Sequence, residues 1–240
     1  MNIITGVHIN SYRPNPFQVS VYPGAGCTRI CTTARFLSQT SSKPLTIINT
    51  HLDHLSDEQR KYGASLLLIR GRYEAATSKG PVLLTGDFNS PPTGRNSGAY
   101  GVTTGKTTPL PVDKRFKEKY HTGKDHFPDF RFLDTRAETP RFGVSENFAT
   151  FTGWSPSATE EWERIDFVFG GSCRRWYVHL PDRGYTWERG VFGLTLANDG
   201  SCLCVCQPYR ASTACKIGAG MSDDGMMHSD HRPVFVDLNI

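Results

Sequence analysis

A strand–helix–strand pattern over residues 45–86 constrains the fold of this 240-residue chain more than any other feature. Residues 45–49 and 82–85 are short apolar runs that predict two buried strands. Between them, Ser56 begins a capping-box pattern that predicts the start of a helix, and Gly80, which is followed by Pro, predicts its end. A connection of this length makes the strands parallel neighbours joined by a right-handed crossover. The chain is therefore predicted to be an α/β protein.

The apolar side chains of the predicted helix recur at steps of four and three residues. These steps place them on one face, as a helix that packs on a sheet requires. The residues predicted to face the sheet are Tyr62, Leu66, Ile69, Tyr73 and Ala76.

Fewer elements can be predicted in the rest of the chain. A helix is expected near residues 112–120, a strand end at 150–153, and strands at 165–169 and 234–238. Residues 1–28 could supply one strand at most.

Composition excludes several classes of protein. With 38% apolar residues the chain can form a sizeable core. Its 7 cysteines are too few for a disulfide scaffold, and an odd number cannot all be paired within the chain. No run of 18 apolar residues predicts a membrane span, and no secretory signal is visible, so an intracellular protein is expected. The net charge of +4 suits an anionic substrate without requiring one, and nothing indicates an oligomer.

Polar side chains follow both predicted parallel strands. His51 follows the first strand, and Asp87 and Asn89 follow the second. Because parallel strands end at the same edge of a sheet, these side chains should lie close together, where open α/β sheets bind ligands. The plain alternatives are an ordinary histidine at position 51 and two turn-forming residues at positions 87 and 89.

Two further residues extend this group. Asp166 lies inside an apolar strand, where a carboxylate is costly unless it is paired, and an imidazole such as that of His231 is a natural partner. Arg164 is the alternative partner, but strand alternation directs it to the opposite face. Asp53 and His54 either cap the next helix or line the rim of the site.

Four segments together resemble the endonuclease/exonuclease/phosphatase superfamily, the DNase I-like metal-dependent phosphoesterases. The segments are NTHLDH at 49–54, TGDFNS at 85–90, RIDFVF at 164–169 and SDHRPV at 229–234, with TFTG at 150–153 as a weaker match. Each is short, but all occur in the order of the superfamily. The resemblance covers residues 29–240, with a possible insertion at about 171–222, and residues 1–28 match poorly. It implies a four-layer α/β sandwich of two packed mixed sheets with outer helices, incomplete at the N-terminal side.

The resemblance also implies roles for single residues. Asp87 would orient or deprotonate the attacking water, and Asn89 would bind a phosphoryl oxygen. His51 and His231 would be the two essential imidazoles at the phosphate, and Asp166 would fix the tautomer of His231. The reaction implied is hydrolysis of a phosphoester with water as the nucleophile.

The implied cofactor is Mg²⁺, with Mn²⁺ as an alternative, and Asp230 would lie on the metal side of the site. The superfamily also has a metal-binding Glu on an N-terminal strand, but no acidic residue precedes Asp53 here. We therefore expect a chain that is truncated at its N-terminus, with weakened metal binding and impaired activity.

The first expectation for the substrate is nucleic acid, cleaved by a nuclease or a 3'-5' RNA exonuclease-like phosphodiesterase. One alternative is a phosphatase or sphingomyelinase-like enzyme that acts on a small or lipid phosphate. The other is a non-catalytic pseudoenzyme.

Overall fold

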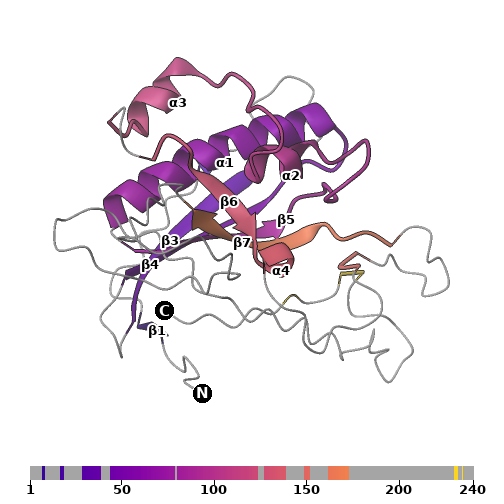
Figure 1. Cartoon of the computed structure of the whole chain (residues 1–240), viewed down its shortest axis with the longest axis horizontal. Helices are drawn as coiled ribbons and strands as arrows, with labels where there is room; N and C mark the ends of the chain where they lie inside the picture. The colour runs from indigo at the N-terminus through magenta and orange to yellow at the C-terminus, as the bar shows by residue number, and fades with distance from the viewer. Residues whose placement is uncertain are drawn as a thin grey trace, which may run out of the picture.

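The computed structural model describes residues 7–8, 17–18, 29–38, 44–78, 80–123, 127–138, 149–151, 162–172, 230–231 and 234. These residues form one mixed β-sheet, and helices α1 and α2 cover one of its faces (Figure 1). The α/β class predicted from the sequence is therefore confirmed.

The described sheet has the strand order β1-β3-β4-β5-β7-β6, and β2 also pairs with β3. β4 and β5 are parallel, as predicted, and the other described pairs are antiparallel. The strands are β1 (Val7–His8), β2 (Phe17–Gln18), β3 (Ile30–Ser38), β4 (Pro44–His51), β5 (Val82–Asp87), β6 (Arg131–Asp134) and β7 (Asp166–Ser172). β5 therefore lies between its parallel partner and β7, a strand from the second half of the chain.

Helix α1 (Asp57–Ser78) is the predicted crossover between β4 and β5. The hydroxyl of Ser56 accepts a hydrogen bond from the backbone N–H of Gln59 over 3.4 Å, so the predicted N-cap is present. Tyr62 and Leu66 are buried against the core, as their spacing predicted.

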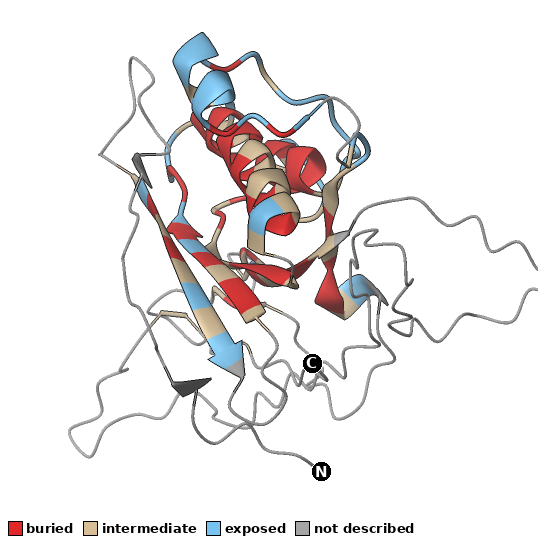
Figure 2. Cartoon of the chain, turned by 90° about the vertical axis from the view of Figure 1, so that its left-hand side faces the viewer, coloured by how far each residue is buried: buried red, intermediate tan, exposed pale blue. Residues whose placement is uncertain are grey.

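The rest of the predicted sheet-facing stripe is only partly buried. Ile69 is half-buried and packs against the core, and Tyr73 and Ala76 are also half-buried. Burial also extends beyond this stripe, because α1 is covered on a second side, where the N–H of Leu110 donates to the hydroxyl of Ser65 over 2.9 Å. A helix between two layers is buried over a wider surface than one stripe (Figure 2).

Three short helices complete the described part. They are α2 (Gly98–Thr103), α3 (Lys114–Lys119) and α4 (Thr135–Glu138). The helix expected near 112–120 is present as α3, and the side chain of Asp113 caps it by accepting from two backbone N–H groups. α2 was not predicted because two of its six residues are glycine, a poor helix former.

Aromatic rings fill the space between the sheet and the helices. Phe88, Phe167 and Phe169 are buried, and their ring centroids lie 4.9–5.7 Å apart. Phe167 and Phe169 project from β7, whereas Phe88 directly follows β5. This cluster fixes the end of β5 against β7 on the helix side, directly behind the residues that carry chemistry.

A buried carboxylate joins α1 to β3. Glu74 is 0% exposed and pairs with Arg70 on the same helix and with Arg35, whose Nη2 lies 2.7 Å from Oε2 of Glu74. Burial of this carboxylate is tolerable because two guanidinium groups compensate its charge.

The described residues test some of the remaining fold predictions and leave others untested. The 1–28 segment contains two short strands, β1 and β2, so the expectation of one strand at most is wrong. The second sheet of the predicted sandwich, the proposed insertion at 171–222 and the strand expected at 234–238 lie largely or wholly outside the described residues and stay predictions. Among the described helices, none has the length and apolar character needed to cross a membrane.

Candidate active site

Three neighbouring strands bring the predicted site residues to one edge of the sheet. His51 at the end of β4 lies opposite Asp87 at the end of β5, because the two strands are parallel and in this register. Asp87 in turn lies opposite Asp166 at the start of the antiparallel strand β7. The sheet therefore places one imidazole and two carboxylates in a row.

Asp87 is at the centre of this row. Its Oδ2 lies 3.4 Å from Nε2 of His51 and 3.8 Å from Nε2 of His231, while its Oδ1 accepts from the backbone N–H of Asn89 over 2.8 Å. One carboxylate oxygen is thus fixed by the backbone, and the other faces two imidazoles.

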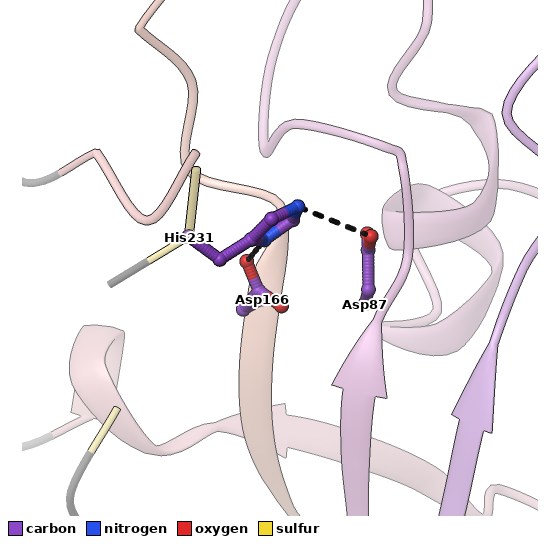
Figure 3. A group of neighbouring side chains, drawn as sticks. All are labelled: Asp87, Asp166 and His231. Atoms are coloured by element: carbon purple, nitrogen blue, oxygen red, sulfur yellow. Dashed lines mark hydrogen bonds and ion pairs between the residues drawn. The ribbon is translucent and has the colours of Figure 1, made fainter. Parts of the chain in front are cut away.

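His231 makes its direct contact with Asp166. Its Nδ1 lies 2.8 Å from Oδ2 of Asp166, and its Nε2 points toward Asp87 (Figure 3). The carboxylate favours the tautomer with a proton on Nδ1, because a carboxylate without a proton can only accept. Arg164, the alternative partner of Asp166, instead pairs with Asp134 at 2.5 Å, as strand alternation predicted.

The backbone adopts positive φ at Gly86, near the end of β5, and at Asn89, in the turn that follows it. Gly86 has φ of +134°, and a Cβ atom there would lie 1.8 Å from the carbonyl oxygen of Thr50. Asn89 adopts φ of +47°, and its Nδ2 donates to the carbonyl of Leu52 over 3.1 Å. Only glycine can pass so close to β4, and the asparagine joins the two strand ends. The amide of Asn89 therefore has a structural contact in addition to the phosphate-binding role predicted for it.

The electrostatic surroundings move three pKa values. Burial raises the pKa of the Asp87 carboxyl, helped by the negative charge of Asp166. Burial lowers the pKa of His51, although the charge of Asp87 opposes this effect. The hydrogen bond with Asp166 raises the pKa of His231 despite its partial burial. The two imidazoles therefore shift in opposite directions: burial disfavours the charged form of His51, whereas the carboxylate of Asp166 favours the charged form of His231.

The outer candidates have different surroundings. Asp53 is buried, and its Oδ1 accepts from the backbone N–H groups of Leu55 and Ser56 over 2.8 Å each, so it shapes the turn that leads into α1. Nδ1 of His54 accepts from Nη2 of Arg29 over 2.9 Å at the rim. Asp230 is half-exposed beside His231. Its assignment to the metal stays a prediction.

Asn49 was not singled out from the sequence beyond its place in the NTHLDH segment. It lies two residues before His51 on β4, and its Oδ1 accepts from the hydroxyl of Thr85 over 3.0 Å. Residues two apart share a face of a strand, so the position of Asn49 relative to His51 could have predicted that both lie on the same face of β4.

The donor atoms of the site are compatible with a divalent cation. Asp87, Asp166 and His231 each offer one ligand atom, and these atoms lie within 4.8 Å of one another. Two carboxylates suit Mg²⁺, and the added imidazole suits Mn²⁺ as well. The residues present therefore fit a metal of this type.

Comparison with known proteins gives matches among solved structures only. No protein-family model matches the sequence, and no curated protein matches it. A conserved protein of unknown function from Enterococcus faecalis aligns with a TM-score of 0.51 and 20% identity over 93% of this chain and 65% of its own.

Two further matches have TM-scores of 0.46 and cover 66% of this chain. An endonuclease/exonuclease/phosphatase from Bacteroides vulgatus is 28% identical over 52% of its own chain. A mannosyl-6-phosphatase from Bacteroides thetaiotaomicron is 23% identical over 51% of its own chain. This chain thus spans between about half and two thirds of the length of these structures.

The match to the Enterococcus faecalis protein is a likeness of fold. The described mixed sheet, with α1 and α2 on one face, agrees with the α/β class predicted from the sequence.

Proposed function

We propose that this protein hydrolyses phosphoester bonds with the help of a divalent cation. The observation that carries the proposal is the contact between His231 and Asp166, because residues 65 positions apart meet at 2.8 Å beside Asp87. The fold does not need an imidazole and two carboxylates in this arrangement, whereas acid–base chemistry does.

In this proposal Asp87 orients the attacking water and accepts its proton. In the absence of a bound cation, burial raises the pKa of this carboxyl above its ordinary value. The backbone N–H of Asn89 holds Oδ1, so Oδ2 is the oxygen available to the water.

The two imidazoles act on the phosphoryl group. Asp166 holds Nδ1 of His231 and raises the pKa of the imidazole, which favours the protonated form with an Nε2–H donor. His51, on the other side of Asp87, is a neutral hydrogen-bond donor. Together they offer donors to the negative charge that develops on the phosphoryl oxygens in the transition state.

A divalent cation would be held by the carboxylates of Asp87 and Asp166, the oxygen ligands that Mg²⁺ prefers. When bound, it would neutralise charge on the phosphoryl oxygens and on the leaving oxygen. The assignment of Mg²⁺ rather than Mn²⁺ is part of the proposal.

Turnover of a diester and a monoester tests the proposal. We expect Mg²⁺-dependent hydrolysis of bis(p-nitrophenyl) phosphate or p-nitrophenyl phosphate, and loss of that hydrolysis in Asp87→Asn. Asp129→Asn is the matched control, because Asp129 is exposed in the loop before β6, at the opposite end of the sheet. Equal rates in the Asp87 and Asp129 variants would contradict the proposal, and no turnover of any phosphoester would support the pseudoenzyme alternative.

Among phosphoesters we place nucleic acid first, because the net charge of +4 suits a polyanion. End-labelled single-stranded RNA would be shortened stepwise from one end by an exonuclease and would be left intact by a phosphatase. Preferential release of inorganic phosphate from small or lipid phosphates would favour the phosphatase or sphingomyelinase-like alternative.

A further inference from the structure

The first residues of β7 lack a strand neighbour on one side in the described sheet. β6 pairs with β7 from Phe169 onward, so Ile165 and Asp166 lie beyond its end. Backbone N–H groups in such a position need another acceptor. Here the acceptor is a single side chain: the hydroxyl of Thr150 accepts from the N–H of Ile165 over 3.0 Å and from that of Asp166 over 2.9 Å.

Phe151, the residue after Thr150, contacts His231, the imidazole partner of Asp166. Phe151 forms a backbone bridge with Glu163 and another with His231. Its ring meets the imidazole of His231 edge-on, with the centroids 5.2 Å apart. Thr150 and Phe151 therefore contact the backbone of Asp166 on one side and both the backbone and the ring of His231 on the other.

We propose that Thr150 is a positioning residue for the active site, one that sets the distance between Asp166 and His231 through its hydroxyl. This inference rests on the proposed function of the pair. Thr150 is 7% exposed, so its hydroxyl is removed from solvent and is committed to the backbone. Because the hydroxyl holds the N–H of Asp166 itself, a shift there moves the carboxylate relative to the ring that it orients.

The matched experiment uses a second buried threonine whose hydroxyl also binds the backbone of β7. Thr135 is 2% exposed, and its hydroxyl donates to the carbonyl of Val168 over 2.7 Å, two residues further from the site. Thr150→Val and Thr135→Val each remove a hydroxyl that hydrogen-bonds the backbone of β7, and both should lower the melting temperature. Thr150→Ser keeps the hydroxyl and serves as the rescue.

Two readouts separate positioning from simple stabilisation. In proton NMR of the metal-free protein, the imidazole N–H bonded to a carboxylate gives a resonance shifted to low field and protected from exchange. We expect this resonance of His231 to be lost in Thr150→Val and kept in Thr150→Ser and Thr135→Val. In kinetics, Thr150→Val should lower kcat by about tenfold with little change in KM, whereas Thr135→Val should leave kcat unchanged.

The two proposals fail in distinguishable ways. Loss of the resonance in Thr150→Val without turnover by the wild type would support the positioning role and contradict the hydrolase. An unchanged resonance in Thr150→Val, or its loss in Thr135→Val to the same extent, would overturn the positioning role while leaving the hydrolase intact. Should Thr150→Val not fold, loss of the resonance in the folded Thr150→Ser variant would overturn the inference, because the serine hydroxyl retains the acceptor.

Discussion

Replacement of Asp166 by Asn isolates the charge of the acid–imidazole pair from its shape. The asparagine side chain has the same size, and its carbonyl oxygen can still accept from Nδ1–H of His231. The variant should therefore keep the ring close to its present place, 2.8 Å from the side chain at position 166, and remove only the negative charge.

The size of the effect follows from the exposure of the two groups. A hydrogen bond to a charged group contributes about 1.5–3 kcal/mol. The side chain of His231 is 30% exposed and that of Asp166 is 22% exposed, so solvent weakens the interaction and the lower half of this range applies. If the bond is fully used in the transition state, Asp166→Asn should lower kcat by about tenfold to fiftyfold, since about 1.4 kcal/mol corresponds to a factor of ten.

The assay is steady-state hydrolysis of the better p-nitrophenyl ester, with the histidine titration followed by NMR in metal-free protein. In the variant, the raised pKa of His231 should fall toward its ordinary value, because the neutral amide accepts a weaker hydrogen bond than the carboxylate and no longer supplies the negative charge that favours the imidazolium. In the wild type this group stabilises the fold fully below the unfolded pKa, and the stabilisation is lost as pH rises through the higher folded pKa. The stability difference between the two proteins should therefore shrink as pH rises. Unchanged kcat and an unchanged titration would refute the role of Asp166.

Four further outcomes are expected. Gly86→Ala should destabilise the fold by about 3 kcal/mol or more in denaturant unfolding, since its Cβ would meet the backbone of Thr50 at 1.8 Å; Gly94→Ala, also at positive φ but with no atom within 4 Å, should cost only about 1–2 kcal/mol. Glu74→Gln should destabilise by about 3–5 kcal/mol, because it leaves two guanidinium groups without their counter-charge, and a smaller loss in thermal unfolding would contradict the importance of that network. Cys31 should resist alkylation at pH 8 in the folded protein, because burial raises the pKa of its thiol to about 12. The free energy of unfolding should fall as pH rises above 9.0, where the thiol ionises in the unfolded chain but not in the folded one. Rapid labelling of Cys31, detected by peptide mapping, would contradict its burial. Chelation of divalent cations should abolish hydrolysis, and restoration by Mg²⁺ but not by Ca²⁺ would agree with the two-carboxylate site.

Local patterns were enough to predict the elements that lead to the site. The capping box before α1, the Gly–Pro after it and the apolar runs on both sides define the parallel pair of β4 and β5. From that pair alone, His51 and Asp87 had to emerge at one edge, and they do. The spacing of apolar residues and the geometry of a strand–helix–strand unit are local properties, so this part of the site could be predicted from the sequence.

Elements set by long-range contacts were missed. β3 contains Arg, Thr and Cys, and β6 contains Arg and Asp; both are strands because a neighbouring strand pairs with them. The partly wrong face of α1 has a similar cause, because α2 and the chain before α3 cover it from a second side. Intrinsic helix and strand propensities depend on local sequence, so they cannot predict burial by an element that is distant in the sequence.

The distances within the site distinguish a close hydrogen-bonded pair from a carboxylate oxygen that is not fully hydrogen-bonded. His231 and Asp166 are in direct contact at 2.8 Å, as expected for a pair that must stay together through the reaction. Oδ2 of Asp87 is held at 3.4 Å and 3.8 Å from the two imidazoles, at the limit of hydrogen bonding or beyond it. The carboxylate that is to meet a water molecule is therefore near both rings but not satisfied by either, and burial without a full set of partners is what raises its pKa. A carboxylate that served only the fold would gain from closing one of those gaps, as Glu74 does with its two arginines.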